Sequence, residues 1–384
     1  MIQETDDMTP DSNSTVFTLT DDQREFRSTV RAFLEHHSPE SQVRSVMESE
    51  EGFDSAIWRA MADQLSLQGL VIPEEYGGEG FGFAELGLVL EEMGAALLPG
   101  PYFTSAVLAA SVLLCSGDDE ACKRYLPGIA SGETIATLAL TERSGRWDRD
   151  GIETSANTDG VGWALRGTKH YVPEGSIADL VLVVARTDSG AVGLFVVENT
   201  EELGRREQSS LDPTRRQAVV ELADTAAVRI GCEDAWPGLR RALSQAAAAL
   251  ANEQVGGAQR CLDQAVSYVK VRTQFGRPVG SFQAIRHRCA DLMLEIECAR
   301  GVAQYAVHAI DNFPAECESA AALAKANCSD AFARAAAANI QLHGGIGFTW
   351  EHPAHMYFKR AKSSAHLLGD AKYHRALLAD AIGV

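Results

Sequence analysis

The sequence predicts an α+β protein with a helical N-terminal part, a β domain in the middle and a helical bundle at the C-terminal end. Three observations support this prediction: helical periodicity at the start of the chain, short runs of branched apolar residues between residues 134 and 230, and alanine-rich helical periodicity from residue 237 almost to the end. A chain of 384 residues also exceeds the size at which one hydrophobic core usually stops growing. We place the domains at residues 16–132, 133–232 and 233–384, after a tail of residues 1–15 that we expect to be disordered.

The N-terminal domain is expected to begin with an amphipathic helix. Thr20 provides a capping hydroxyl, and Phe26, Val30 and Phe33 then fall on one face. Further helical patterns follow at residues 57–68, 84–98 and 104–114, and residues 71–80 have turn chemistry throughout.

The middle of the chain changes to strand patterns. Branched runs bounded by Gly, Asp and Ser predict strands at residues 134–142, 163–172, 178–187 and 191–198. The C-terminal part is long enough for four or five helices packed as a bundle, and no repeat of fixed period is evident.

Composition limits the classes of function. The net charge of −19 disfavours nucleic acid or an anionic membrane as partner, because both require basic patches. No run of about 18 apolar residues occurs and the N-terminus is acidic, so we expect a cytoplasmic protein without a signal peptide or membrane span. The eight cysteines form no CxxC pair, and the histidines near the C-terminus lack the spacing of a metal site, so no metal is expected.

One segment, residues 267–300, carries a corner suited to binding an anion. A helical pattern there runs into Arg272, and Gly276 and Pro278 interrupt it before a second helical pattern begins near Gln283. A guanidinium group at such a helix end can bind a diphosphate with two parallel hydrogen bonds. Arg272 alone is most simply explained as a solvated charge that stabilises the dipole at a helix C-terminus.

A second glycine-rich segment lies about 70 residues further on. Gly344, Gly345 and Gly347 lack a Cβ and so let backbone amides approach a phosphate closely. An ordinary helix-terminating turn would have the same composition. Together with Arg272 and Phe275, this segment favours phosphate binding over an ordinary turn.

The sequence resembles the acyl-CoA dehydrogenase family in three segments: VIPEEYGGEGFG at 71–82, RTQFGRPVGSFQAIRHRCADLM at 272–293 and QLHGGIGFTWEHP at 341–353. The resemblance implies a tetramer of like or mixed chains, flavin adenine dinucleotide (FAD) bound across a subunit interface, and α,β-dehydrogenation of an acyl-coenzyme A. It also implies an electron-transferring flavoprotein as electron acceptor. The FAD contacts that it implies in this chain are Arg272, Phe275, Gly276, Gln283, Gln341, Gly344 and Gly345.

The catalytic base that the resemblance implies is missing from this sequence. The two positions at which the family places that base hold Leu368 and Ala246, neither of which can accept a proton. Glu253 lies seven residues after Ala246, about two helical turns along the same face, and is a candidate substitute base. It is also explained as a structural hydrogen-bond acceptor. Asp370 is another candidate base.

The flavin-ring contacts are altered too. The family's Thr-Glu-Pro-Gly-Ala-Gly-Ser-Asp segment corresponds to TERSGRWDRD at 141–150, where bulky side chains replace the glycines. The family's Trp-Ile-Thr corresponds to Tyr171, Val172 and Pro173, and proline has neither a hydroxyl nor an amide hydrogen.

This pattern of retention and loss favours an accessory subunit. Such a chain supplies the site for the adenosine diphosphate part of FAD to a catalytic partner of the same family, as in actinobacterial mixed tetramers that act on steroid side-chain thioesters. A self-sufficient dehydrogenase that uses Glu253 or Asp370 as base is the first alternative. A structural scaffold without flavin is the second.

Overall fold

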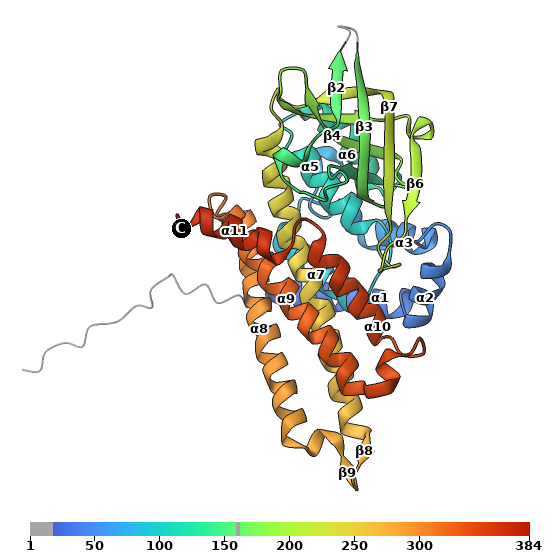
Figure 1. The fold of residues 1–384 in the computed structure, drawn as a ribbon, viewed down its shortest axis with the longest axis vertical. Helices are drawn as coiled ribbons and strands as arrows, with labels where there is room; N and C mark the ends of the chain where they lie inside the picture. Colours follow the sequence, from blue (N-terminus) through green and yellow to red (C-terminus); the bar gives the residue numbers. More distant parts are fainter. Residues whose placement is uncertain (1–17, 159–161) are drawn as a thin grey trace, which may run out of the picture.

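The computed structural model describes residues 18–158 and 162–384 and has the α+β architecture that the sequence predicts (Figure 1). A β barrel occupies one end of the molecule and a bundle of long helices extends to the other, with the N-terminal helices packed against both. The predicted fold class is therefore confirmed. The tail predicted at residues 1–15 lies outside the described residues.

The N-terminal helices begin at polar capping residues. Thr20 Oγ1 accepts a hydrogen bond from the Gln23 amide at 3.1 Å, and Asp54 and Asp118 cap later helices in the same way. The segment expected to form one helix at 104–114 begins as a π-helix, and residues 40–48 and 119–130 form helices that we did not predict. The elements are α1 (Asp21–His37), α2 (Glu40–Glu48), α3 (Ser55–Leu65), η1 (Leu67–Gly69), η2 (Glu74–Tyr76), α4 (Phe83–Ala96), η3 (Phe103–Ala109), α5 (Ala110–Leu114) and α6 (Asp119–Ala130).

The middle of the chain is a closed barrel. Its strands are β1 (Ala136–Ala139), β2 (Ser155–Thr158), β3 (Trp163–Pro173), β4 (Leu180–Thr187), β5 (Val192–Val197), β6 (Gly204–Gln208) and β7 (Gln217–Ile230). Strands β4, β2, β3, β7 and β5 pair in that order, and β5 pairs again with β4, so the sheet closes on itself. Strand β1 extends the sheet beside β4, and β6 does so beside β7. The barrel interior is filled by apolar side chains such as Val183, Phe195 and Val220.

The C-terminal part, described throughout from residue 233 to residue 384, forms the helices α7 (Trp236–Val271), α8 (Gln283–Asn312), α9 (Cys317–His343), α10 (Ala354–His366) and α11 (Ala371–Ala381). Small buried side chains, such as Ala251, Ala303 and Ala324, line the contacts among α7, α8 and α9. A short hairpin, β8 (Thr273–Gln274) and β9 (Arg277–Pro278), followed by η6 (Val279–Ser281), joins α7 to α8. The turn η7 (Gly344–Phe348) follows α9.

A buried cluster of charged side chains joins the three parts of the chain. The Glu253 carboxylate of α7 accepts hydrogen bonds from Arg215 Nη2 with both oxygens at 2.7 Å, and from Arg360 Nη1 of α10 at 2.9 Å. Arg215 belongs to the loop that precedes β7, and all three residues are at most 6% exposed. A carboxylate buried between two guanidinium groups fixes the barrel loop onto the bundle.

Arg360 extends this cluster to the N-terminal part. Its Nη2 donates to the carbonyl oxygens of Leu98 at 3.1 Å and Thr214 at 3.0 Å, and its Nε donates to Thr214 Oγ1 at 2.9 Å. Asp212 forms a second ion pair with Arg360 at 3.2 Å. One guanidinium group therefore contacts all three parts of the chain.

Substitution of Arg360 tests this junction. Arg360→Met leaves the Glu253 carboxylate with one cationic partner, and removal of one partner from a buried ion pair typically costs about 3–5 kcal/mol. We expect a loss of that size in urea-induced unfolding. The control Arg375→Met removes an ion pair with Asp330 in which both side chains are at least 38% exposed, and it is expected to cost less than about 1 kcal/mol. Equal losses for the two variants would contradict the assignment.

Candidate functional site

The arginine corner lies at the end of the bundle farthest from the barrel (Figure 1). Arg272 caps α7, the β8–β9 hairpin turns the chain, and Gln283 begins α8. The turn is tight: Phe275 has φ 52° and Gly276 has φ 77°, and nothing lies within 4 Å of where a Cβ on Gly276 would be. The Phe275 side chain is 91% exposed. The corner therefore presents its side chains outward from the chain.

Positive charge is concentrated at this corner despite the net charge of −19. In the part of the chain that the structure describes, neither Arg272, Arg277 nor Arg286 forms an ion pair with a carboxylate. The Arg277 guanidinium lies over the Phe282 ring at 4.1 Å, and the Phe275 ring meets Phe282 edge-on at 6.1 Å. Guanidinium groups without carboxylate partners are available to an anionic ligand.

The second glycine-rich segment reaches the same end of the bundle. Gly344 ends α9 with φ 65°, and neither Gly344 nor Gly345 has an atom within 4 Å of its Cβ position. Gln341 is exposed one position before the buried Leu342. The His343 ring lies 4.4 Å from the Tyr268 ring of α7, so the turn packs directly beside the last turn before Arg272. The structure thus brings together two segments that are about 70 residues apart in the sequence.

Gln283 begins α8 and contacts a histidine of the same helix. Its Nε2 lies 2.6 Å from His287 Nε2, and both side chains are exposed on the first turns of α8. Its amide is therefore oriented by a histidine one helical turn further along.

A cavity lies where the barrel meets α10 and α11. It has a volume of about 520 Å³ and is lined by loops of the barrel and by the end of the bundle, including Thr141, Trp147, Tyr171, Lys362, His366 and Asp370. Asp370 Oδ1 also caps α11 by accepting from the Tyr373 amide at 2.7 Å. Residues of both segments expected to contact the flavin ring, 141–150 and 171–173, therefore line this cavity.

The two positions at which the family resemblance implies a base, Leu368 and Ala246, do not face this cavity. Leu368 is 3% exposed and Ala246 is fully buried, and both belong to the hydrophobic core that the N-terminal helices share with α7. Leu368 has φ 62°, a left-handed conformation that is uncommon for a residue with a Cβ. Neither residue can exchange a proton with a bound molecule.

Glu253 is held as a structural carboxylate. Burial alone would raise its pKa, but the charges and hydrogen bonds of Arg215 and Arg360 outweigh burial and lower it. A base acts by accepting a proton, and two guanidinium groups that already bind both oxygens oppose that step. The sequence did not indicate these partners, because Arg215 and Arg360 lie 38 and 107 residues away.

The segment 141–150 is organised by a residue that the sequence analysis did not select. The Lys169 ammonium group, fully buried, donates to Glu142 Oε1 at 2.7 Å, and the same oxygen accepts from the amides of Glu153 and Thr154. Burial lowers the pKa of Lys169 to about 8, although the Glu142 charge acts to raise it. Trp147 is 8% exposed and fills space beside the cavity.

A second unpredicted lysine holds the turn between α10 and α11. The buried Lys325 ammonium group donates to Ser329 Oγ at 3.1 Å, the Ala365 carbonyl at 3.4 Å and the Gly369 carbonyl at 3.0 Å. Its neighbour in the core, His374, donates from Nε2 to the Leu368 carbonyl at 2.9 Å. These bonds fix the backbone on both sides of the left-handed Leu368.

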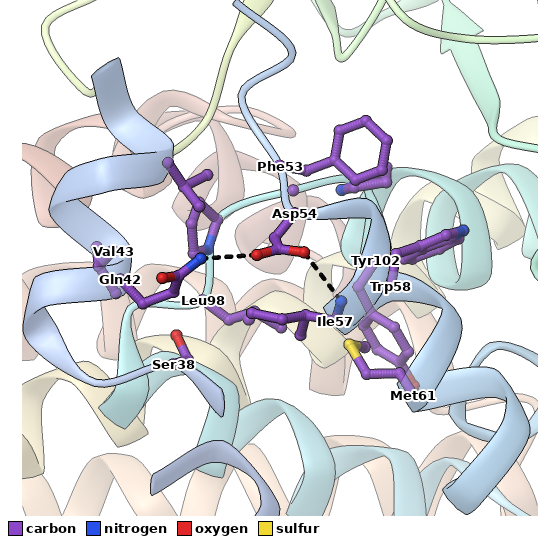
Figure 2. A pocket seen from close by; sticks show the side chains of 14 residues that line it. Ser38, Gln42, Val43, Phe53, Asp54, Ile57, Trp58, Met61, Leu98 and Tyr102 are labelled. Atoms are coloured by element: carbon purple, nitrogen blue, oxygen red, sulfur yellow. Dashed lines mark hydrogen bonds between the residues drawn. The ribbon is translucent and has the colours of Figure 1, made fainter. Parts of the chain in front are cut away.

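A smaller pocket in the N-terminal part has too little space for a ligand. It lies among Ser38, α2, α3 and the residues before η3, where Gln42 Nε2 donates to Asp54 Oδ2 at 2.7 Å (Figure 2). Apolar side chains such as Trp58 and Met61 line the rest, and the space holds about 20 Å³, the size of one water molecule.

Within residues 18–158 and 162–384, no three His, Cys, Asp or Glu side chains are grouped so that they could hold a metal ion. The helices of these residues are also all too short or too polar to cross a membrane.

Three family models match consecutive parts of the chain: the acyl-CoA dehydrogenase N-terminal domain over residues 20–133, the middle domain over residues 137–226 and the C-terminal domain over residues 236–383. The chain therefore belongs to the acyl-CoA dehydrogenase family, whose members are FAD-dependent oxidoreductases.

The chain is similar to particular members of this family. Acyl-CoA dehydrogenase IpdE2 of Mycobacterium tuberculosis is 39% identical over 342 residues, which cover 89% of this chain and 91% of that protein. The solved structure of a variant of the Tcur3481-Tcur3483 steroid ACAD matches with a TM-score of 0.84 and 32% identity over 94% of this chain and 97% of that one. The ChsE4-ChsE5 complex from Mycobacterium tuberculosis matches with a TM-score of 0.86 and 29% identity over 95% and 98%.

The pH dependence of stability tests the position of Lys325. Burial lowers the pKa of Lys325 to about 7, whereas an unfolded lysine titrates near about 10.4. Between these values the unfolded chain binds more protons, so the free energy of unfolding should rise as pH increases from about 7 to about 10. Lys169, whose pKa burial lowers to about 8, contributes to the same rise, so Lys325→Met is expected to reduce the rise in urea unfolding measured across this range without abolishing it. The exposed control Lys372→Met should keep the full rise, and an undiminished rise in Lys325→Met would contradict this account.

Proposed function

We propose that this chain is an accessory subunit that binds the adenosine diphosphate part of FAD for a catalytic partner of the same family. The observation that carries the proposal is a contrast between two places in one chain. The arginine corner and the glycine turn are exposed together at one end of the bundle, while both base positions are apolar and buried.

The residues at the corner fit the phosphate-bearing half of FAD. Arg272 offers a guanidinium group without a carboxylate partner among the described residues, and Gly344 and Gly345 leave space for a phosphate to approach the backbone. The exposed Phe275 ring offers an apolar face beside them. Gln283 and Gln341 contribute exposed side-chain amides near the corner. Gly276 provides the left-handed turn after Phe275 that leaves the Phe275 ring exposed.

The flavin-ring half fits this chain less well. Pro173 is buried and has no amide hydrogen or hydroxyl, and the amide of Tyr171, which lines the cavity, already donates to Gln208 Oε1 at 3.2 Å. When bound, FAD accepts the hydride taken from an acyl-coenzyme A thioester. On this proposal the ring, the base and the thioester belong to the partner, and this chain contributes binding free energy.

Two similar structures support a mixed assembly. The names of the ChsE4-ChsE5 and Tcur3481-Tcur3483 structures each give two chains, and the second is described as a steroid ACAD. We propose a paralogous catalytic chain as partner, in a mixed tetramer, and a bulky steroid-type acyl group as substrate. An electron-transferring flavoprotein completes the proposed reaction as acceptor.

The alternative of a self-sufficient dehydrogenase is weakened by the environment of Glu253. Both of its oxygens are bound by Arg215, and Arg360 binds one of them as well. Asp370 is better exposed to the cavity, although it caps α11. The alternative of a scaffold without flavin leaves the arginines of the corner without a ligand.

Arg272→Ala tests whether the corner binds flavin. Charge-assisted hydrogen bonds contribute about 1.5–3 kcal/mol, so we expect the complex with a catalytic paralogue to bind FAD roughly 10- to 100-fold more weakly. Flavin absorbance per complex, recorded after gel filtration, gives the measurement. Arg334→Ala removes an exposed arginine of α9 that pairs with Glu295 and is the matched control. Unchanged flavin content in Arg272→Ala would contradict the assignment of this corner to FAD.

Glu253→Gln separates the accessory subunit from a self-sufficient enzyme. The substitution leaves two buried guanidinium groups without their carboxylate, so a loss of stability is expected. Turnover per folded complex should remain, because the proposed base lies in the partner. The chain purified alone should show neither full flavin occupancy nor acyl-coenzyme A oxidation. Turnover by the chain alone that disappears in Glu253→Gln would instead establish Glu253 as the base.

A further inference from the structure

His343 occupies the contact between the two halves of the corner. It is the last residue of α9 and directly precedes Gly344. One neighbour is Tyr268 of α7, with ring centroids 4.4 Å apart, and the other is His352, at 4.1 Å. His343 therefore contacts an aromatic ring on α7 and a second ring beyond η7.

Tyr268 connects His343 to Arg272. The Arg272 amide donates to the Tyr268 carbonyl at 2.9 Å, and this bond ends α7. The apolar residues Ala265, Val269 and Leu342 pack beneath the same contact. A displacement of the His343 ring would therefore move the glycine turn relative to the arginine.

The His343 ring is fixed and closed to solvent. It is 5% exposed, and its Nδ1 lies 2.8 Å from the Asn339 carbonyl oxygen, so Nδ1 carries the hydrogen that is donated. A ring buried in this way does not itself reach a phosphate. It can affect a ligand only by positioning the two segments that it contacts, the end of α7 and the glycine turn.

The surroundings of His343 are sensitive to charge. Burial lowers the pKa of His343 and also of His352, and the charge of His343 lowers the pKa of His352 further. The other groups near the pair are the Tyr268 ring on α7, Glu40 and Arg44 on α2, and His355 on α10. If both rings took up a proton, two cations would face each other at 4.1 Å.

We propose that His343 is a positioning residue that holds the arginine corner and the glycine turn in register for FAD binding, and that its protonation loosens this arrangement. The inference rests on the proposed function, because it assigns regulation to the same flavin site. A neutral aromatic ring at position 343 is what the arrangement requires, since contact with Tyr268 and His352 uses the ring faces and edges.

Two substitutions and a pH series test the proposal. FAD affinity is measured by flavin fluorescence on the full chain in complex with its catalytic paralogue, at about pH 7.5 and about pH 5.5. His343→Ala removes both ring contacts and should weaken FAD binding about tenfold at the higher pH. His343→Phe keeps a ring and should stay within about threefold of the wild type. His36→Ala, at an exposed histidine of α1, is the control.

The pH series distinguishes positioning from a direct phosphate contact. Positioning predicts that the wild type binds FAD several-fold more weakly at the lower pH than at the higher one, whereas His343→Phe loses most of this dependence. Wild-type affinity that increases in acid would mean that His343 contacts phosphate, and unchanged affinity in His343→Ala would mean that it positions nothing. Either result would overturn the role of His343 but leave the proposed function standing. Absence of FAD binding by the wild-type complex at both pH values would overturn the proposed function together with it.

Discussion

The buried carboxylate of Glu253 and its two guanidinium partners determine how the three parts of the chain fit together. Arg215 comes from the barrel and Arg360 from the bundle, and Arg360 also binds a carbonyl of the N-terminal part. Buried charges are costly unless they are fully paired, so these parts have one relative arrangement that satisfies all of them. The same pairing removes Glu253 from acid–base chemistry. A carboxylate about two helical turns from Ala246, where the family resemblance implies a base, is part of the framework.

The framework separates two ends of the molecule with different properties. At the barrel end, buried lysines fix the loops: Lys169 organises the segment around Glu142, and Lys325 fixes the turn that contains Leu368. At the other end, the hairpin and the glycine turn are exposed, and arginines there lack carboxylate partners among the described residues. Buried lysine hydrogen bonds therefore fix the backbone near the cavity, whereas the groups able to hold an anion lie at the free end of the bundle.

Much of the fold followed from periodicity, and much of the site did not. The change from helical to strand patterns near residue 134 and back near residue 237 predicted the architecture, because these patterns are local. The corner at Arg272 was also predicted from residue type and spacing, whereas the turn at Gly344 was assigned to the same site through the family resemblance. The partners of Glu253 and the role of Lys325 were not, since their contacts join residues 38 to 107 positions apart or bind backbone carbonyls, which have no sequence signature. The contact of His343 with Tyr268 was not predicted either, because it also joins residues that are far apart in the sequence.

The exposed Phe275 has a consequence for the cell as well as for the molecule. Phe275 is 91% exposed, so a partner surface that covers its ring removes apolar area from water, which is favourable. The hairpin that carries Phe275 can bury this ring only in an assembly. On the proposed assembly, subunit association and cofactor retention are linked by mass action. The fraction of flavin bound then depends on how much of each subunit is made, so balanced synthesis of the two chains becomes a condition for an active enzyme.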